Sequence, residues 1–563
     1  MLGRPALGYQ NYEEVITENI FYIDKTDFIR EWWEYGDKVT LITRPRRFGK
    51  TLNMSTVECF FSNKYAGRGD LFEGKAIWND KKYRQLQGTF PVIFLSFASV
   101  KTGKIEGIKT AVKKIISNVY SEHRDMMHSP KFNDMDRAYY DEMICNMSDD
   151  MAYTSINSLC IYLEKYFGNK VIILLDEYDT PMQESWLAGS WDESVEFFSN
   201  FFNATFKTND HIYRGIITGI TRISKESIFS DLNNLKVVTT TSDEYASCFG
   251  FSEEEVFAAL DDKGLGNEKQ GVKKWYDGFT FGKHRDIYNP WSILSFINAN
   301  GCYSAYWSNT SGNGLVNSLI QKGNASIKQT MEDLLRGKGF EAKIDEQIVF
   351  SQLNSNVNAV WSLLLATGYL RIDSLEQTGK FKKNVYILKL TNMEVEIMFS
   401  DMIEGWFNGS AEADYNDFIK ALLLDDRKAM NRYMNKVALA TFSSFDTGNK
   451  PSEYTEPERF YHGFVLGLMV DLADRYSVTS NRESGFGRYD VMLEPRNEKD
   501  DAIILEFKVY DPDDEKSLDD TVQSALRQIE EKRYSASLEA KGIEPGRIRK
   551  YGFAFRGKEC RIG

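Results

Sequence analysis

The sequence predicts an α/β protein of several domains, and three observations support this class. Its 563 residues are too many for one ordinary hydrophobic core. Short apolar runs, typical of buried parallel strands, alternate with helical periodicity in the first half of the chain. A second group of strands follows a helical middle and lies near the C-terminus. We expect domains at residues 1–245, 246–330, 331–445 and 446–563.

The composition is that of a globular protein, with 42% hydrophobic and 27% charged residues. The start of the chain lacks the apolar segment of a signal peptide, and no apolar run is long enough to span a bilayer. The six cysteines form no C-x-x-C pair, so we expect reduced thiols, no zinc site and a cytoplasmic location. The net charge of −13 argues against a surface coated for nonspecific nucleic-acid binding.

The first candidate site is the stretch LITRPRRFGKT, residues 41–51, which nearly matches the P-loop pattern G-x-x-x-x-G-K-[ST]. An apolar strand precedes it and a helical pattern follows, so backbone N–H groups and a helix N-terminus can point at phosphates. Arg44 replaces the first glycine, and Pro45 fixes the backbone beside it. By itself the stretch fits an arginine-rich surface turn equally well. The expected nucleotide-binding residues are Arg46, Arg47, Phe48, Gly49, Lys50, which reaches the outer phosphates, and Thr51, which coordinates magnesium.

A second motif, VIILLDEYDTP at residues 171–181, favours the P-loop interpretation. Five apolar residues form a buried strand, and Asp176 and Glu177 stand at its carboxyl end, where ligands bind in open α/β sheets. Asp176 can hold magnesium, and Glu177 can polarise the attacking water. The alternative, a strand that ends in a charged turn, is the minor one because two motifs occur in the right order.

A third apolar strand, IYRGIITGITRIS at residues 212–224, leads into Thr218 and Arg222. In AAA and STAND ATPases a polar residue at the end of the neighbouring strand senses the γ-phosphate, so both residues are candidates for that role. An ion pair between Arg222 and a surface carboxylate is an equally good interpretation.

Six segments carry a family resemblance when they are read in order: FYIDKTDFI, RPRRFGKT, LLDEYDTP, TGITRIS, WYDGFTFG and IYNPWSI. Over roughly its first half, the chain resembles the bacterial AAA-ATPase-like family, a STAND-related group of predicted P-loop ATPases. The resemblance implies ATP as the ligand and an arginine in place of the loop's first glycine as a family trait. It also implies nucleotide-dependent homo-oligomerisation.

The middle of the chain predicts a helical lid and a winged-helix-like region. Pro290 in YNPWSI resembles the proline through which STAND lids contact nucleotide, and an ordinary turn proline is the alternative. Residues 359–373 run from helix into strand, and residues 381–390 supply a second strand, as in the wing of a winged helix.

A second candidate site lies in two strands near the C-terminus, GRYDVMLEP (487–495) and AIILEFKVY (502–510). Strand periodicity places Glu506 and Lys508 on one face, while Asp490 on the neighbouring strand can converge with Glu506 on a hard cation. Lys508 can then orient the attacking water beside the metal.

This spacing, D…E-x-K, resembles the PD-(D/E)XK nuclease superfamily. A preceding helix at 458–476, a following helix at 519–534 and a final strand at 550–557 complete an αβββαβ, restriction-endonuclease-like pattern. The resemblance implies that Gln528 and Tyr534 lie near the site, that Asp490 and Glu506 bind Mg²⁺ or alternatively Mn²⁺, and that nucleic acid, DNA in the first place, is the partner.

We therefore expect an ATP-binding and hydrolysing protein with a magnesium-dependent nuclease (phosphodiesterase) domain, in which the ATP state gates cleavage or binding of nucleic acid. A role in defence against foreign DNA fits this combination. The alternative is a STAND-like signalling switch or scaffold whose nuclease fold only binds nucleic acid or protein.

Overall fold

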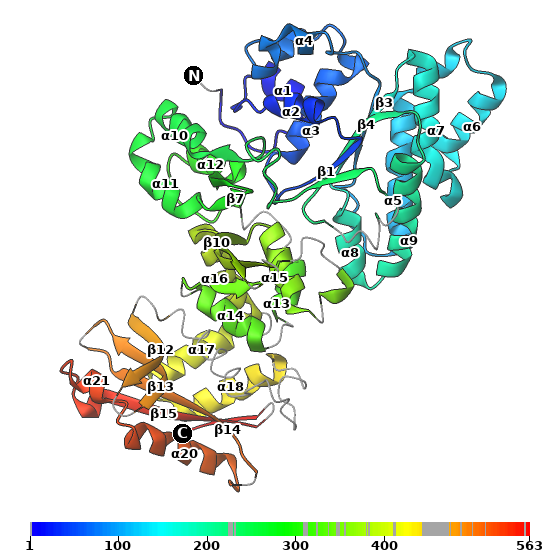
Figure 1. Cartoon of the computed structure of the whole chain (residues 1–563). Helices are drawn as coiled ribbons and strands as arrows, with labels where there is room; N and C mark the ends of the chain where they lie inside the picture. The colour runs from blue at the N-terminus through cyan, green and yellow to red at the C-terminus, as the bar shows by residue number, and fades with distance from the viewer. Residues whose placement is uncertain are drawn as a thin grey trace. The chain divides into compact units, whose positions relative to one another are not determined.

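In the computed structural model the chain forms two compact units, Met1–Val316 with Gly339–Glu396, and Asn317–Lys338 with Ile397–Gly563 (Figure 1). The boundaries of the four domains predicted above stay a prediction. The structure describes residues 3–222, 229, 232–307, 314–321, 325–335, 337–344, 350–353, 356–378, 380, 383–408, 412–441, 472, 475–484, 487–497, 499–512, 514–556 and 559–563.

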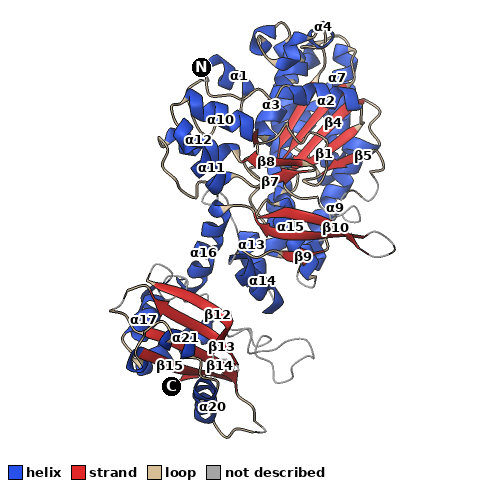
Figure 2. Cartoon of the chain, turned by 60° about the vertical axis from the view of Figure 1, so that its left-hand side comes forward, coloured by secondary structure: helices blue, strands red, loops and turns tan. Residues whose placement is uncertain are grey.

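A five-stranded parallel sheet lies at the centre of the first unit (Figure 2). Its strand order is β2-β3-β4-β1-β5, and each neighbouring pair is parallel. Every residue of β1 and β3 is buried, as their continuous apolar sequences predict. The strands are β1 (Val39–Thr43), β2 (Val92–Ser96), β3 (Val171–Asp176), β4 (Ile212–Gly219) and β5 (Leu235–Val238).

Helices pack against this sheet, with α3 in contact with β2 and β3, and α5 in contact with β2. The carboxyl ends of β1 and β4 are in register, Thr43 opposite Gly219, and the segments that follow the strands therefore meet at one edge. The helices are α1 (Tyr12–Thr17), α2 (Asp27–Tyr35), α3 (Lys50–Phe61), α4 (Lys81–Arg84), α5 (Ile105–Glu122), α6 (Asp134–Cys145), α7 (Asp149–Phe167), α8 (Thr180–Ala188) and α9 (Trp191–Phe202).

A smaller helical subdomain follows the sheet and has its own hydrophobic core, which includes Val256, Tyr276 and Phe296. We call it the lid. A capping box begins α10, with Ser252 and Glu255 as its reciprocal partners. The elements of the lid are β6 (Phe251–Ser252), α10 (Glu253–Asp262), α11 (Lys269–Tyr276), β7 (Phe279–Phe281), β8 (His284–Tyr288) and α12 (Pro290–Asn298).

The next segment shows the wing predicted from the sequence. Strands β10 (Leu370–Thr378) and β11 (Lys383–Leu390) form an antiparallel hairpin, and β11 also pairs with β9 (Phe340–Ala342). The helices of this region are α13 (Gly314–Gln321), α14 (Ala325–Leu335), α15 (Val357–Ala366) and α16 (Met393–Asn408). Along the chain the order is helix, helix, strand, helix, strand, strand.

The second unit holds a mixed sheet of order β12-β13-β14-β15-β16, in which β14 and β15 are parallel and the other pairs antiparallel. One face packs on α17 and α18 and the other on α20 and α21. The predicted strand–strand–strand–helix–strand order is confirmed, whereas residues 458–471 of the predicted first helix lie outside the described residues. The elements are α17 (Glu412–Leu423), α18 (Arg427–Thr441), β12 (Tyr476–Ser484), β13 (Gly487–Pro495), β14 (Ala502–Val509), α20 (Leu518–Glu531), α21 (Ala536–Glu539), β15 (Ile548–Arg556) and β16 (Glu559–Ile562).

Candidate functional site

The loop between β1 and α3 has the backbone of a phosphate-binding turn. Gly49 adopts a φ of 79°, a left-handed conformation that favours glycine, and is the N-cap of α3. Helix α3 begins at Lys50, and the first-turn N–H groups of a helix have no partner within the helix. They form the kind of site that binds anions.

Arg44, which replaces the first glycine of the P-loop pattern, is completely buried. Its guanidinium donates hydrogen bonds to the carbonyl oxygens of Thr43 (2.9 Å), Thr239 (2.7 Å) and Glu244 (3.1 Å), and lies 4.6 Å from the ring centre of Phe281. Burial lowers the pKa of Arg44 to about 10. The side chain therefore fastens the loop to the segment after β5 and to the lid, and leaves phosphate binding to other residues.

Lys50 lies between the loop and the acidic turn that follows β3. Its side chain is only 3% exposed, and its ammonium lies 3.6 Å from a carboxylate oxygen of Glu177. It also donates to the carbonyl oxygens of Arg44 (3.2 Å) and Pro45 (3.1 Å). A lysine at this position can exchange these carbonyl oxygens for the oxygens of a phosphate.

Asp176 joins the P-loop to the neighbouring strand. Its Oδ2 accepts a 2.7 Å hydrogen bond from Thr51 Oγ1, and its Oδ1 accepts a 2.5 Å hydrogen bond from Thr218 Oγ1. Burial, and secondarily the charge of Glu177, raises the pKa of Asp176 to about 6, while the two hydroxyl donors oppose the shift. The hydroxyl of Thr51 and the carboxylate of Asp176 are the oxygen ligands that magnesium prefers, so this set fits the metal of an ATPase.

Glu177 stands in a left-handed backbone conformation with a φ of 55°, which is unusual for a residue with a side chain. Its side chain is 20% exposed and accepts a 3.3 Å hydrogen bond from Thr180 Oγ1. Glu177 lines the cleft. The backbone turn after β3 therefore directs its carboxylate toward that cleft.

Of the two sensor candidates, Thr218 is brought into contact with Asp176. Arg222 is half-buried at the end of a described stretch, and its contacts within the described residues do not include a hydrogen bond or ion pair with the P-loop. A sensor role for Arg222 stays a prediction.

A cleft of about 530 Å³ lies beside the loop, within the range of about 300–1,000 Å³ that is common for ligand sites. Its walls come from the N-terminal segment, the P-loop, the turn after β3 and the lid. Tyr9, Lys101 and Trp291, which were not among the predicted site residues, also line the cleft. Eight predicted site residues line it: Arg46, Arg47, Phe48, Gly49, Lys50, Thr51, Glu177 and Pro290.

The lid contacts the P-loop directly through the start of α12. The buried side chain of Asn289 caps α12 and donates a 3.2 Å hydrogen bond from Nδ2 to the carbonyl oxygen of Arg46. The guanidinium of Arg47 lies 4.2 Å from the ring centre of Trp291, a cation–π contact. Sequence reasoning singled out Pro290 alone, although an asparagine before proline is a helix-start signal that points to its neighbour.

The second candidate site is assembled on β13, β14 and α20. The register pairs Val491 with Leu505 and, continued by one residue, brings Asp490 opposite Glu506. Asp490 Oδ2 accepts a 2.8 Å hydrogen bond from the backbone N–H of Phe507. The two carboxylates therefore come from adjacent strands, as the sequence predicts.

Glu506 is 2% exposed, and its Oε1 accepts a hydrogen bond from Gln528 Nε2. The same amide nitrogen lies 3.1 Å from the hydroxyl of Tyr534, which is buried. Gln528 and Tyr534, both expected near the site, are thus brought to it by α20 and by the turn that follows this helix. Burial raises the pKa of Tyr534, so this hydroxyl stays protonated at neutral pH.

Lys508 shares a sheet face with Glu506. Phe507 belongs to the core on the α17–α18 side of the sheet, together with Ile503 and Leu505, while the alternating residues face α20. Lys508 is half-buried. Two carboxylates with a lysine beside them fit a hard divalent cation and a phosphodiester.

In the part of the chain that the structure describes, no helix is long and apolar enough to cross a bilayer. All six cysteines are free thiols in the structure.

Two parts of the chain match known families: residues 6–229 match the family described as Predicted AAA-ATPase, and residues 456–563 the PD-(D/E)XK nuclease superfamily. An "Uncharacterized protein in vnfD 5'region" of Azotobacter chroococcum mcd 1 is 22% identical over 551 residues, which cover 95% of this chain and 94% of that protein. Among solved structures, the Aeropyrum pernix ORC2 protein in ADPNP-ADP complexes aligns with 67% of this chain and 92% of its own, at 8% identity and a TM-score of 0.23.

Each matched region contains one of the two sites described above. The first contains Lys50 and Asp176, and the second contains Asp490 and Glu506. The chain carries an AAA-ATPase-like domain in its N-terminal part and a domain of the PD-(D/E)XK nuclease superfamily at its C-terminal end.

Proposed function

We propose that the protein binds and hydrolyses ATP at the P-loop, cleaves nucleic acid at the C-terminal domain, and uses the ATP state to gate that cleavage. The observation that carries the ATPase part of the proposal is the hydrogen bond between Thr51 and Asp176, 2.7 Å long, which brings the expected magnesium-binding residues of a P-loop ATPase together. A turn that resembled a P-loop by accident would not meet an aspartate at the end of a buried strand.

The roles of the residues follow from their positions. Lys50 binds the outer phosphates, and the first-turn N–H groups of α3 hold the remaining phosphate oxygens. Glu177 accepts a proton from the attacking water and orients it, while Thr218 keeps Asp176 in place. Magnesium held by Thr51 and Asp176 would supply positive charge to the phosphates.

At the C-terminal site Asp490 and Glu506 would hold Mg²⁺ or Mn²⁺, which would stabilise charge at the scissile phosphate. Lys508 orients the attacking water, and Gln528 holds the carboxylate of Glu506. We propose nucleic acid, with DNA ahead of RNA, as the substrate. This assignment accords with a role in defence against foreign DNA.

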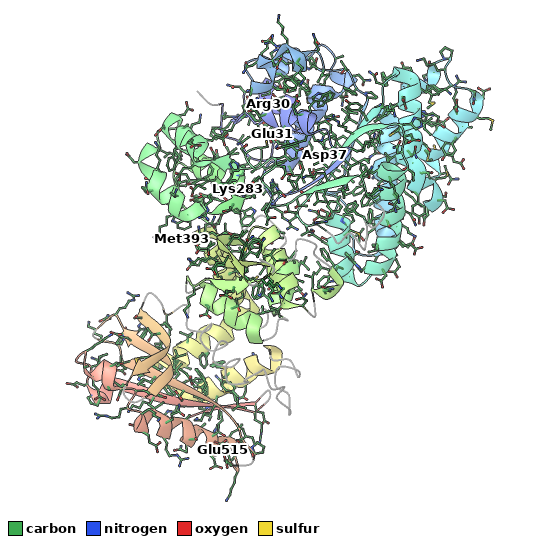
Figure 3. All side chains as sticks on the ribbon, in the orientation of Figure 1. Arg30, Glu31, Asp37, Lys283, Met393 and Glu515 are labelled. Atoms are coloured by element: carbon green, nitrogen blue, oxygen red, sulfur yellow. The ribbon has the colours of Figure 1, made fainter. Side chains whose placement is uncertain are left out.

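The gating proposal is supported by a chain of contacts inside the first unit. Helix α12 contacts the P-loop through Asn289, and its Ser292 donates a 2.8 Å hydrogen bond to Glu394 Oε2. Glu394 is completely buried and also accepts a 2.5 Å hydrogen bond from the backbone N–H of Trp307. It follows Met393, which begins α16 and is labelled in Figure 3. Helix α16 continues along the chain past Glu396, where the second unit begins.

A second candidate function, a nucleotide-dependent switch or scaffold whose nuclease fold only binds nucleic acid or protein, is favoured by the net charge of −13. Retention of Asp490, Glu506 and Lys508 favours the enzyme. Nucleotide-dependent oligomerisation is compatible with either function.

The test is to incubate the purified full-length protein with single-stranded and duplex DNA and RNA, with Mg²⁺ or Mn²⁺, with and without ATP. Glu506→Ala and Lys508→Ala proteins serve as the comparison. We expect cleavage by the wild type and none by either variant. Intact ATP hydrolysis without cleavage under any condition would favour the switch or scaffold.

A further inference from the structure

Asp179 is a buried carboxylate close to the ATPase residues, yet neither phosphate nor metal binding accounts for it. It stands two residues after Glu177, in the turn between β3 and α8, and its side chain is 0% exposed. It occupies the N-cap position of α8 without making a side-chain cap. Burying a carboxylate is costly unless hydrogen bonds compensate, so its partners indicate its task.

A single oxygen of Asp179 accepts four hydrogen bonds, all from neutral groups. Three come from the two residues that follow β4: the backbone N–H groups of Ile220 (3.1 Å) and Thr221 (2.8 Å), and Thr221 Oγ1 (2.7 Å). The fourth comes from Gln183 Nε2 at 2.9 Å. Bonds from several donors to a carboxylate are strong because the acceptor is charged. Asp179 therefore ties the turn after β3 to the end of β4.

The neighbour of Asp179 makes the same connection. The backbone N–H of Tyr178 donates to the carbonyl oxygen of Thr218 at 3.0 Å, and its hydroxyl donates to the carbonyl oxygen of Thr221 at 2.8 Å. Both residues of the turn thus bind the segment that carries the sensor candidates.

Gly219 shows how closely the two segments approach each other. A Cβ atom at this position would lie 2.7 Å from Asp179 Oδ1 and 2.6 Å from Tyr178 Cε1, distances that allow no side chain. The carbonyl oxygen of Gly219 also accepts a 3.1 Å hydrogen bond from the backbone N–H of Arg44 at the start of the P-loop. The P-loop, the turn after β3 and the end of β4 therefore meet at one point.

This meeting point holds Glu177 in its left-handed conformation, with a φ of 55°. Such a conformation persists only where the surrounding structure enforces it. The hydrogen bonds that Tyr178 donates and Asp179 accepts provide that enforcement. Gln183 extends the network to the cleft because its Oε1 accepts a 3.4 Å hydrogen bond from Arg46 Nη2.

We propose that Asp179 is a positioning residue for ATP hydrolysis: it fixes the turn after β3 against the end of β4, so that Glu177, Asp176 and Thr218 face the γ-phosphate together. The inference rests on the proposed ATPase activity. It predicts a defect in the chemical step with little change in ATP affinity, because Asp179 holds other residues and lines no part of the described cleft.

The test compares wild type, Asp179→Asn and a matched control, Asp192→Asn, whose side chain is exposed at the start of α9 in the same unit. Asparagine keeps the shape of aspartate but removes the charge from the acceptor. ATP affinity, kcat and the affinity for ADP with aluminium fluoride, a mimic of the transferring phosphoryl group, are measured on the full chain, and the melting temperature confirms folding.

For Asp179→Asn we expect ATP affinity within about threefold of wild type and a fall in kcat of about 10–100-fold, since small displacements of catalytic groups have such effects. Affinity for ADP with aluminium fluoride should fall by a similar factor, while Asp192→Asn behaves as wild type. A folded Asp179→Asn protein with wild-type kcat would overturn the inference, as would equal losses of ATP and ADP–aluminium fluoride binding.

Should Asp179→Asn fail to fold, Thr221→Val carries the test, because it removes one donor to Asp179 at nearly constant volume. We expect a lower kcat with unchanged ATP affinity, and recovery in Thr221→Ser, which retains the hydroxyl. Wild-type kcat in Thr221→Val would then overturn the inference. A wild-type protein without ATPase activity above a Lys50→Ala background would instead refute the proposed ATPase, and the role of Asp179 with it.

Discussion

Thr51 and Asp176 are 125 positions apart in the sequence, and the hydroxyl of the first donates a 2.7 Å hydrogen bond to the carboxylate of the second. Thr218 donates to the other carboxylate oxygen, so strands β3 and β4 and the first turn of helix α3 contribute to one polar cluster. The carboxyl edge of the sheet is thereby the place where a phosphate, a metal and a water can be handled together.

Lys50→Ala should weaken nucleotide binding. Lys50 is the buried cation beside the first turn of α3, and removal of a charge-assisted contact to a phosphate weakens binding by about 10–100-fold. The measurement is the affinity for ATP by calorimetry. Lys81→Ala, at an exposed lysine of α4 in the same unit, is the control and should bind as wild type does. Equal affinities in the two variants would remove Lys50 from the site.

Glu177→Gln should separate binding from hydrolysis. The side chain of Glu177 lines the cleft and keeps its place in the turn, but an amide cannot accept the proton of the attacking water. We expect kcat to fall by about 100-fold or more and ATP affinity to stay within about threefold. Single-turnover hydrolysis, together with equilibrium binding, measures both. Hydrolysis at the wild-type rate would show that Glu177 has no part in the mechanism.

Arg44→Gly, which introduces the first glycine of the P-loop pattern, should lower the free energy of unfolding. Arg44→Gly removes the donors to three carbonyl oxygens, those of Thr43, Thr239 and Glu244, and leaves a cavity beside Phe281. We expect a loss of about 3 kcal/mol in the free energy of unfolding, measured by chemical denaturation. Arg47→Gly is the comparison, since Arg47 has a φ of 67° that glycine adopts easily, and its stability should stay near that of wild type. An Arg44→Gly protein that kept its stability and bound ATP more tightly would contradict this account.

Glu394 should make the first unit less stable as the pH rises. Burial raises its pKa from the ordinary 4.5 to about 7, so the folded state binds the proton more tightly than the unfolded chain does. Its contribution is fully present below about pH 4.5 and is lost as the pH rises to about 7, a change of about 3 kcal/mol. Glu394→Gln should remove this part of the pH dependence. Denaturation curves at pH 5 and pH 7.5 test it, and an identical slope in both proteins would argue against a raised pKa.

The sequence was sufficient to predict elements that depend on local pattern. The strand before Asp176, the helix after Gly49 and the alternation of Glu506, Phe507 and Lys508 all follow from periodicity within a few residues. The convergence of Gln528 on Glu506 came from the resemblance to the nuclease superfamily, and the structure brings the two together.

Contacts between distant segments could not be predicted in the same way. Arg44 turns toward Thr239 and Glu244, about 200 residues away in sequence, and no local pattern shows which way a buried arginine points. The bond of Asn289 to the carbonyl oxygen of Arg46 spans 243 residues. From its position just before a helix, Asp179 has the pattern of a helix-capping residue. Its carboxylate instead accepts hydrogen bonds from the residues that follow β4, because β3 and β4 are neighbours in the sheet.

The measurement that tests the central claim most directly is the rate of magnesium-dependent cleavage of duplex DNA by the full-length protein, with and without ATP. Wild type is compared with Lys50→Ala and with Glu506→Gln. The control is Lys550→Ala, which changes a half-buried lysine on β15, the strand beside β14. We expect ATP to change the cleavage rate of wild type and of Lys550→Ala. ATP should not change the cleavage rate of Lys50→Ala, and Glu506→Gln should not cleave. Cleavage that persists in Glu506→Gln, or that responds to ATP equally in Lys50→Ala, would contradict the central claim.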